Sequence, residues 1–391
     1  MTDVAIVAGR RTPVTGRSRA QKALRVHELA GAALAVVAQE AGRTPEAVVL
    51  GNCVGPGGNL GRLAALSAGF GTQCVGWAVD AQCGSGLVAL QQAADHVRRT
   101  GAAVAAGGAE SASTAPVRVV DGVEQVQARF APEGFADPDM TTAADALAAA
   151  RGISRARQES FALRSHALSL DAEELLARET TCVVDTVAAV AAIDDGPRRL
   201  TPGVLSRFRP LIDSPRATVT PGTAARIADG AAALMLVPAD EADGAHLVIR
   251  GSALTGGDPA LPGLAAAPAV EEVLRQGGVG MANLGAVEVV EAYAAQALAT
   301  LDDLGLADSA QESGDGVDPR VNAAGGALAL GHPWGASGAI AVVRLLHRLE
   351  NSPVGTLGVA ACAIGGGMGA AVLVERRGAA PSGASQLRGT C

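Results

Sequence analysis

One cysteine stands at an expected strand-to-helix turn, a setting suited to nucleophilic catalysis. Cys83 follows an apolar segment and is itself followed by Gly84, Ser85 and Gly86. The start of a helix carries partial positive charge and free backbone N–H groups, which lower the pKa of a thiol and stabilise an oxyanion. We therefore predict that Cys83 is a nucleophile. The alternative is a buried structural cysteine in a tight glycine turn.

A histidine occupies a second turn of the same kind. His332 lies in the run G-H-P-W-G-A-S-G at residues 331–338. An imidazole beside a thiol can take its proton, as in other cysteine–histidine nucleophile pairs. The alternative is a structural histidine whose ring nitrogens are satisfied by hydrogen bonds. The equivalent position of the two turns favours a catalytic pair of Cys83 and His332.

The elements around these two turns repeat. In each copy an apolar segment leads into the turn, and a helix, a buried strand and a glycine cluster follow. The predicted segments are 76–82, 87–99 and 102–107 in the first copy and 327–330, 339–349 and 357–362 in the second. We interpret this order as an internal duplication of one α/β unit, whose two glycine turns face one another.

The region between the copies differs in character, which suggests a division of the chain. Residues 117–223 are rich in Arg, Asp and Glu, with a predicted helix at 155–178 and a proline-rich stretch at 194–221. We expect an inserted loop domain there. Residues 1–116, completed by about 224–246, form the first half, and residues 247–376 form the second. The end, residues 377–391, is predicted to be a disordered tail.

Composition and charge exclude several classes of protein. Of the 391 residues 49% are hydrophobic but only 2% are aromatic, and 50 are glycine, so the core must consist of small aliphatic side chains. The net charge is -8 without a basic run, which argues against a nucleic-acid partner. The six cysteines form no C-x-x-C pair, so we expect neither a zinc site nor a redox pair.

The sequence also carries expectations about location. Its start lacks the basic-then-apolar pattern of a secretory signal. The uncharged stretch 321–343 contains several glycines and the pair His332-Pro333, which argue against a membrane span. We expect a cytoplasmic protein that does not interact with membranes and has no disulfide framework.

The two turns belong to a longer ordered series of motifs. These are R-T-P at 11–13, G-N-C-V-G-P-G-G-N at 51–59, V-D-A-Q-C-G-S-G-L at 79–87, G-G-A-E-S at 107–111, I-S-R-A-R-Q-E-S-F-A-L-R-S-H at 153–166, D-G-A-A-A at 229–233, N-A-A-G-G-A-L-A-L-G-H-P-W-G-A-S-G at 322–338 and G-G-G-M-G at 365–369. In this order they resemble the thiolase family, the acetyl-CoA acetyltransferases, along nearly the whole chain to about residue 375.

The resemblance implies an α/β fold, the thiolase fold, with a duplicated five-layered αβαβα architecture and a loop domain over the site of coenzyme A. It implies that Cys83 becomes the acyl-enzyme, that His332 activates it, and that Gly365 provides a backbone oxyanion contact. No cofactor is bound permanently, since the coenzyme A thioester is a substrate. We select as candidate contacts to coenzyme A four cations and one small residue: Arg198, Arg207, Arg209, Arg226 and Ala225.

The chain departs from the family pattern at three positions. The second catalytic cysteine of thiolases corresponds here to Ala363, and Cys362 lies one residue earlier. Adjacent side chains of a strand point to opposite faces, so Cys362 is expected to face away from Cys83 unless a bulge turns it. Thiolases have N-E-A-F where this chain has V-E-A-Y, so Val290 replaces an Asn that helps to hold a water in an oxyanion hole. Ala225 replaces a Ser found in many thiolases near the pantetheine.

These features lead to one main hypothesis and two alternatives. We predict an acyltransferase that loads Cys83 from an acyl-CoA and passes the acyl group to CoA, a carbon nucleophile or a heteroatom acceptor. One alternative is a catalytically idle partner subunit of another condensing enzyme. The other is a conventional acetyl-CoA acetyltransferase that uses Cys362. The family forms dimers through the halves that bear the nucleophile, and the short segment 117–139 favours a homodimer over a tetramer.

Overall fold

The computed structural model describes residues 2–125, 128–184, 189–191, 193–310 and 316–379. The predicted tail lies outside the described residues from position 380 onward, and its first residue, Arg377, still belongs to a strand. Among the described residues, no helix combines the length and the apolar character that crossing a bilayer requires.

The first half of the chain forms a mixed five-stranded sheet. Its strands lie in the spatial order β1-β10-β5-β3-β4, with β10 antiparallel to β1 and β5, and β3 parallel to β5 and β4. In chain order its elements are β1 (Val4–Arg11), the short β2 (Thr15–Gly16), α1 (Val26–Glu40), β3 (Ala47–Gly51), α2 (Leu60–Ser67), β4 (Val75–Val79), the 3-10 turn η1 (Gln82–Gly84), α3 (Ser85–Thr100), β5 (Val104–Glu110), β10 (Ala228–Pro238) and η2 (Ala239–Glu241).

The second half repeats this arrangement. Its strands lie in the order β11-β14-β13-β12, and Val321 pairs in parallel with Val287 of β12, where the first half has β4. Its elements are β11 (His246–Gly256), η3 (Pro262–Leu264), α8 (Ala266–Gly277), η4 (Met281–Asn283), β12 (Leu284–Val289), α9 (Ala294–Asp303), α10 (Ala327–Leu330), α11 (Trp334–Leu349), β13 (Leu357–Ile364) and β14 (Met368–Arg377). The same order of helices and strands in both halves confirms the predicted duplication.

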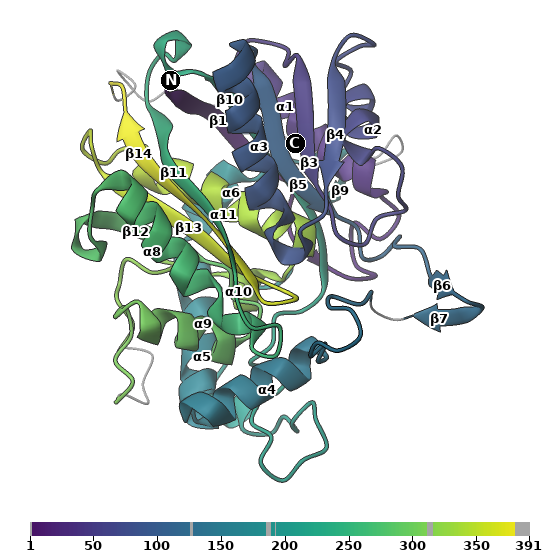
Figure 1. The fold of residues 1–391 in the computed structure, drawn as a ribbon, viewed down its shortest axis with the longest axis vertical. Helices are drawn as coiled ribbons and strands as arrows, with labels where there is room; N and C mark the ends of the chain where they lie inside the picture. Colours follow the sequence, from purple (N-terminus) through teal and green to yellow (C-terminus); the bar gives the residue numbers. More distant parts are fainter. Residues whose placement is uncertain (1, 126–127, 185–188, 192, 311–315, 380–391) are drawn as a thin grey trace.

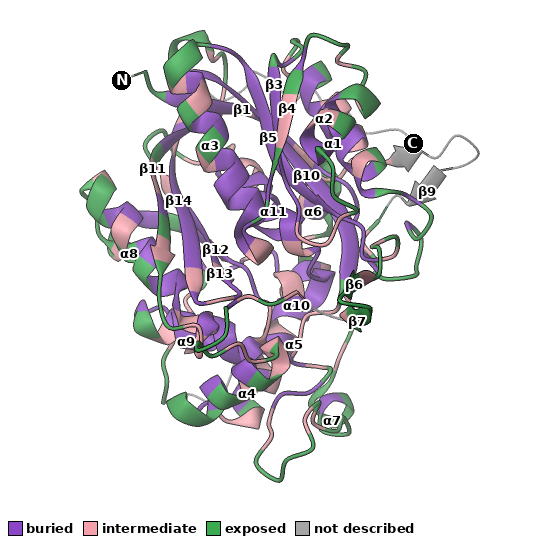
Figure 2. Cartoon of the chain, turned by 45° about the vertical axis from the view of Figure 1, so that its right-hand side comes forward, coloured by how far each residue is buried: buried purple, intermediate pink, exposed green. Residues whose placement is uncertain are grey.

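The two halves stack into five layers (Figure 1). Helices α3 and α11 pack against one another between the sheets, α1 and α2 cover the outer face of the first sheet, and α8 and α9 cover that of the second. Pairing of β1 with β11, Ala5 opposite Val248, joins the sheets edge to edge. Figure 2 shows most strands of the two sheets and the facing sides of α3 and α11 buried, which is where the largest group of core side chains lies, while the edge strand β4 is partly exposed.

Small residues are required where the halves meet. The backbone at the start of α11 approaches β5 so closely that a Cβ on Gly108 would lie 1.9 Å from the carbonyl oxygen of Gly335. A side chain there would separate the two halves at the site of the predicted turns. Glycine at position 108 thus permits the close approach of backbones in the central layer.

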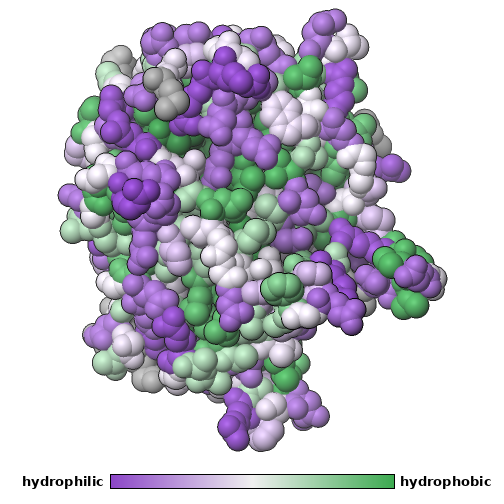
Figure 3. Space-filling model, viewed as in Figure 1, coloured by the Kyte–Doolittle hydropathy of each residue, from purple (hydrophilic) through white to green (hydrophobic). Residues whose placement is uncertain are grey.

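The segment 117–223 lies between β5 and β10 and covers the second half. Helices α4 and α5 pack against α9, and the β6–β7 hairpin projects from the body, with hydrophobic surface at its tip (Figure 3). Its elements are β6 (Arg118–Val120), β7 (Val123–Gln125), α4 (Met140–Arg151), α5 (Arg155–Asp171), α6 (Glu173–Glu179), β8 (Val183–Val184), β9 (Ala189–Ala191) and α7 (Pro202–Leu205). The prediction of one helix over 155–178 is wrong, because the chain leaves helical geometry at Ala172 (φ -98, ψ 22).

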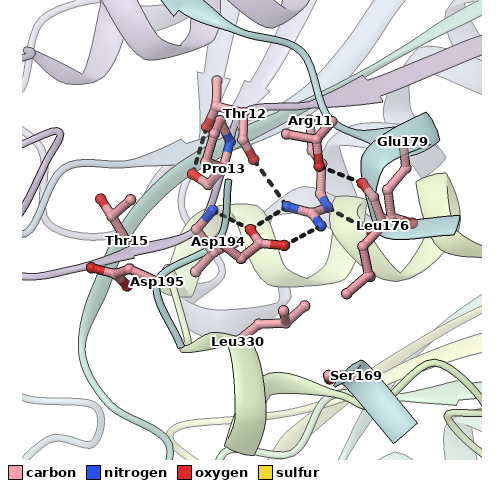
Figure 4. Close-up of polar contacts among 12 residues, drawn as sticks. Arg11, Thr12, Pro13, Thr15, Ser169, Leu176, Glu179, Asp194, Asp195 and Leu330 are labelled. Carbon is pink, nitrogen blue, oxygen red and sulfur yellow. Dashed lines mark hydrogen bonds and ion pairs between the residues drawn. The ribbon is translucent and has the colours of Figure 1, made fainter. Parts of the chain in front are cut away.

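The change of direction at Ala172 carries Glu179 into a buried ionic cluster (Figure 4). Its carboxylate accepts hydrogen bonds from Arg11 at 2.7 Å and from Arg344 at 2.7 Å and 2.8 Å, while Arg11 also binds Asp194 in a bidentate pair. Burial alone would raise the pKa of Glu179, but the two guanidinium groups outweigh it and lower that pKa to about 2. The cluster joins α6, β1 and α11, so it fixes the segment 117–223 to the central layer.

Replacing Glu179 by glutamine is expected to lower the free energy of unfolding by about 3 kcal/mol, because it leaves two buried guanidinium groups without their carboxylate. Since the folded pKa is depressed, the contribution of Glu179 is present above its unfolded pKa of 4.5 and is lost as the pH falls toward 2. Urea unfolding at pH 7 measures the loss. Glu40→Gln, which breaks an exposed pair with Arg10, is the matched control and should leave the midpoint unchanged. Equal midpoints for both variants would contradict a stabilising cluster.

Candidate active site

Cys83 lies in the 3-10 turn between β4 and α3, as the sequence predicts. The turn is held by Ser85, whose hydroxyl accepts a hydrogen bond from the backbone N–H of Ala81 at 2.9 Å and donates to the carbonyl of Gln82 at 2.6 Å. Gln82 has a φ of +50, an uncommon left-handed conformation for a residue other than glycine. A Cβ on Gly84 would lie 2.2 Å from the side chain of Ile364, so a larger residue here would have to displace Ile364.

His332 lies directly before α11, in the corresponding turn of the second half. Its backbone N–H donates to the carbonyl of Arg226 at 2.9 Å, and its ring Nδ1 lies 2.6 Å from the hydroxyl of Ser337. Because that hydroxyl donates its proton to the carbonyl of Pro333, we assign the imidazole proton to Nδ1. The other ring nitrogen, Nε2, is buried and has no hydrogen-bond partner among the described residues. It therefore carries a free lone pair.

Cys83 and His332 line the same cavity, of about 580 Å³. The cavity wall includes residues of both halves and of the segment 117–223. Besides the pair, it includes Arg17, Cys53, Val54, Gln82, Arg118, Phe130, Met140, Thr141, Leu147, Ala225, Ile227, Pro262, Tyr293, Trp334, Ala363, Ile364 and Gly365. Its size suits a small-molecule ligand.

The nucleophile and the histidine are both electrically neutral at pH 7. Burial raises the pKa of Cys83 well above its ordinary value, and the neighbouring Cys362 and Glu110 raise it further. Burial lowers the pKa of His332 to about 4. The expectation that the helix start lowers the thiol pKa is wrong, because desolvation outweighs the backbone contribution. A thiolate at this position must therefore form during reaction, by proton transfer.

Position 363 lies on the cavity and position 362 does not. The β13–β14 ladder runs without a bulge through the pairs Cys362–Ala370 and Ala363–Gly369, so the two side chains point to opposite faces. Cys362 is fully buried, and burial raises its pKa to about 12. The expectation that Cys362 faces away from Cys83 is nevertheless wrong. Its sulfur lies 3.3 Å from the carbonyl oxygen of Cys83, because η1 packs on β13.

The V-E-A-Y segment follows β12 and divides between the core and the cavity. Val290 is buried in the core, with its backbone N–H bonded to the carbonyl of Ala361, and it is not part of the cavity wall. Glu291 is also buried and accepts hydrogen bonds from Asn322 and Ser165. Tyr293 lines the cavity and its hydroxyl lies 3.0 Å from that of Thr141.

Of the residues predicted to contact coenzyme A, only some lie on the wall of the cavity. Gly365 and Ala225 line the cavity. None of the four predicted cations belongs to its wall: Arg198, Arg207 and Arg209 are exposed elsewhere, and Arg226 binds Asp195 and the carbonyl of Leu330. The basic side chains on the wall are instead Arg17 and Arg118. They come from segments whose proximity to Cys83 is created by the fold and has no signal in the sequence.

Two further polar groups near Cys83 are absent from the sequence-based prediction. The thiol of Cys53 lines the cavity and lies 3.2 Å from the side-chain oxygen of Gln82. Glu110, in the G-G-A-E-S motif, accepts hydrogen bonds from Asn52, from the backbone of Cys53 and Val54, and from the backbone of Gly335. Its carboxylate thus ties the loop after β3 to the start of α11. Burial raises the pKa of Glu110 to about 7.

The remaining cysteines and the possible metal ligands can be compared with the expectations from the sequence. Cys53, Cys74, Cys83 and Cys362 are free thiols, whereas Cys182 is disulfide-bonded, a single bond that the expectation of no disulfide framework did not include. Proximity of two thiols depends on the fold, which spacing alone does not reveal. In the part of the chain that the structure describes, no three His, Cys, Asp or Glu side chains are grouped as metal ligands would be.

Comparison with known proteins places this site in a family. The family model described as "Thiolase, N-terminal domain" matches residues 4–240, and the one described as "Thiolase, C-terminal domain" matches residues 245–376. The "Putative acetyl-CoA C-acetyltransferase YhfS" of Bacillus subtilis is 35% identical over 376 residues, which cover 95% of this chain and 98% of that protein. A 3-ketoacyl-CoA thiolase of Aeromonas hydrophila is 34% identical, with coverage of 96% and 100%.

A solved structure agrees with these matches. The crystal structure of the Bacillus anthracis acetyl-CoA acetyltransferase superposes with a TM-score of 0.86 at 28% identity, covering 96% of this chain and 99% of that one. The five-layered arrangement of two similar α/β halves is therefore the thiolase fold, as the motifs predicted. With both family models matched along its length, the chain belongs to the thiolase family.

Proposed function

We propose that this member of the thiolase family is an acyl-CoA-dependent acyltransferase that carries its acyl group on Cys83. The observation that supports it most is the shared cavity, in which a half-buried thiol and an unpartnered imidazole nitrogen are both on the wall. The proposal is tested by mixing the protein with acetyl-CoA and longer acyl-CoAs and measuring release of CoA in the first turnover. Release equimolar with the protein supports it, and no release contradicts it.

The neutral pair determines how loading proceeds. Nε2 of His332 accepts the proton of Cys83 while the sulfur attacks the carbonyl carbon of the thioester. The negative oxygen of the tetrahedral intermediate is stabilised by backbone N–H groups, for which we propose Gly365. When the carbon–sulfur bond to coenzyme A breaks, the leaving thiolate takes the proton from His332. The acyl-enzyme and free CoA result, and no permanently bound cofactor takes part.

The identity of residue 363 limits which acceptors can follow. Deprotonating the α-carbon of a second thioester needs a positioned base, and the methyl group of Ala363 cannot act as one. We propose that the acyl group passes to CoA, to a carbon nucleophile generated without that base, or to an oxygen, nitrogen or sulfur acceptor. Cys362 does not replace the missing base, because it is fully buried beneath the nucleophile turn.

Replacing Ala363 by cysteine is expected to restore carbon–carbon chemistry. A thiol at this position would lie on the cavity wall, so thiolysis of a 3-ketoacyl-CoA should accelerate by about a hundredfold, the usual contribution of a general acid–base group. Loading of Cys83 should change by less than about threefold, because it does not need that group. The measurement is kcat for thiolysis beside the loading rate. Ala363→Ser is the control of similar size, and equal gains for Ser and Cys would contradict an acid–base role.

The partner-subunit alternative makes a distinct prediction. An idle subunit would release no CoA and would co-purify with a second condensing enzyme. The losses at Ala363 and Val290 favour it, whereas the preserved pair of Cys83 and His332 favours an enzyme. CoA release in the first turnover therefore separates the two.

We further propose a cytoplasmic homodimer that binds acyl-CoA. Strand β4 ends the sheet of the first half, and Val75 on it is 54% exposed, as are Leu63 and Leu66 of the adjacent α2 at 43% and 44%. An apolar edge of this kind is a natural association surface. It supports pairing through the halves that bear the nucleophile.

For the phosphates of CoA, Arg17 and Arg118 on the cavity wall are better candidates than the four arginines proposed from the sequence.

A further inference from the structure

The cavity wall combines residues of two kinds. Arg17, Val117 and Glu124 are exposed. Ala144 and Leu147 of α4 are 4% and 1% exposed, and α4 packs against η3 and α9, which also contribute to the wall. The charged phosphates of coenzyme A need the solvent-exposed part of the wall. The buried part, around α4, η3 and α9, suits an apolar acyl chain on Cys83.

A pair of hydroxyl groups lies on the cavity wall where α4 and α9 begin. Thr141 lies in the first turn of α4 and Tyr293 immediately precedes α9, and their side-chain oxygens are 3.0 Å apart. Burial raises the pKa of Tyr293, and a charge on Cys83 would raise it further, so the phenol is within electrostatic reach of the nucleophile. Where this chain has Tyr293, the family motif N-E-A-F has a phenylalanine, which lacks the hydroxyl.

We propose that the Thr141–Tyr293 pair binds an oxygen atom of the acyl group, so that the preferred substrate is a hydroxyacyl- or oxoacyl-CoA. This inference rests on the proposed function, because it assigns the acyl group that Cys83 accepts. It concerns an oxygen on the part of the substrate that becomes attached to the enzyme, not on the part that leaves.

The count of hydroxyl protons on the Thr141–Tyr293 pair indicates that the pair binds a hydrogen-bond acceptor. Two hydroxyls carry two protons, and the hydrogen bond between them uses one. Neither oxygen has another hydrogen bond within the described residues, so one proton remains to be donated into the cavity. A carbonyl or hydroxyl oxygen of the ligand would accept it. A plain alkyl chain would displace water from the pair and leave this donor unsatisfied, which is unfavourable.

Single-turnover loading of Cys83, followed by intact mass, tests the proposal. The probes are hexanoyl-CoA and its 3-hydroxy, 5-hydroxy and 5-oxo derivatives. We expect the best oxygenated probe to load about three- to tenfold faster than hexanoyl-CoA, the usual selectivity of one neutral hydrogen bond. Tyr293→Phe and Thr141→Val should each bring the ratio of oxygenated to hexanoyl loading rates down to about one. Thr142→Val, at an exposed position outside the cavity, should retain the preference.

A wild-type protein that loads all probes equally would overturn the proposal, as would a preference that persists in Tyr293→Phe. Binding of the same probes to Cys83→Ala, measured by calorimetry, gives a second readout that needs no chemistry. If no probe loads onto the wild type, the proposed acyl-enzyme fails. The hydroxyl pair is then still judged by whether oxygenated probes bind Cys83→Ala more tightly than they bind Cys83→Ala/Tyr293→Phe.

Discussion

Replacing Cys83 by alanine is expected to lower kcat/KM for acyl transfer by at least about 10⁴-fold, the scale of losses when a covalent nucleophile is removed. The reason is that a methyl side chain at this position leaves the cavity and His332 intact but provides no atom to form the thioester. Other groups in the cavity can still bind acyl-CoA, so binding should persist while turnover is lost. Steady-state kinetics combined with calorimetric binding separates these two effects.

Cys53 provides the control for this variant, since its thiol lines the same cavity. Burial, together with the charge of Glu110, raises the pKa of Cys53 far above its ordinary value, and the recorded contact of its thiol is with the amide of Gln82 and not with an imidazole. Cys53→Ala is therefore expected to load an acyl group, whereas Cys83→Ala is not. Acyl transfer that survives in Cys83→Ala but disappears in Cys53→Ala would show that the nucleophile has been assigned to the wrong turn.

Replacing His332 by asparagine is expected to slow loading of Cys83 by about 10²- to 10⁴-fold at pH 7, because the proton acceptor is lost. The change should also alter the pH dependence. In the wild type the imidazole, with a pKa of about 4, is neutral above that pH, so the loading rate should be flat from about pH 5 upward and fall below pH 4. In His332→Asn the thiol must ionise unaided, and its raised pKa makes the rate rise about tenfold per pH unit through the neutral range.

The measurement is the first-order rate of loading at saturating acyl-CoA, between pH 4 and pH 9. Ser337→Ala is the matched control, since it removes the hydrogen bond at Nδ1 but leaves Nε2 in place. It should retain the flat profile at a lower rate. A flat profile in His332→Asn would show that another group takes the proton and would contradict the assigned pair.

Local signals in the sequence were sufficient to locate Cys83 and His332. Each lies between an apolar segment and a helix, in a glycine-containing turn where the backbones of the two halves approach closely, as the contacts of Gly86 and Gly335 show. The same local signals repeat, which made the duplication predictable. The starts of α3 and α11 lie two and five residues before the expected ones, because small residues such as Gly86 and Gly335 are compatible with helix or loop.

What the sequence could not provide is contact between distant segments. Thr141 and Tyr293 are 152 residues apart in the chain, and no local pattern relates them. The four arginines chosen for coenzyme A were selected by charge and by position in or just after the insertion, yet Arg226 is engaged by Asp195. Alternation along β13 correctly separates positions 362 and 363, but it cannot reveal that η1 places the backbone of Cys83 against the sulfur of Cys362.

The sequence likewise could not predict how burial and neighbouring charges combine to set the pKa of Cys83. A helix start lowers a thiol pKa when the thiol is solvated, whereas desolvation, Cys362 and Glu110 act together to raise it here. In the proposed mechanism the thiolate of Cys83 is consequently transient, and loading depends on His332 more than on the helix. This shift of emphasis from helix dipole to imidazole is the main change that the structure makes to the mechanism.

Mass spectrometry of the wild-type protein after brief exposure to acetyl-CoA, with the adduct mapped to a peptide, is the decisive test of Cys83 as the acyl carrier. We predict a single acetyl group per chain, located on the peptide that contains Cys83 and absent from the His332→Asn protein quenched at the same short time. An unmodified protein, or an acetyl group found on Cys53 with Cys83 free, would contradict it.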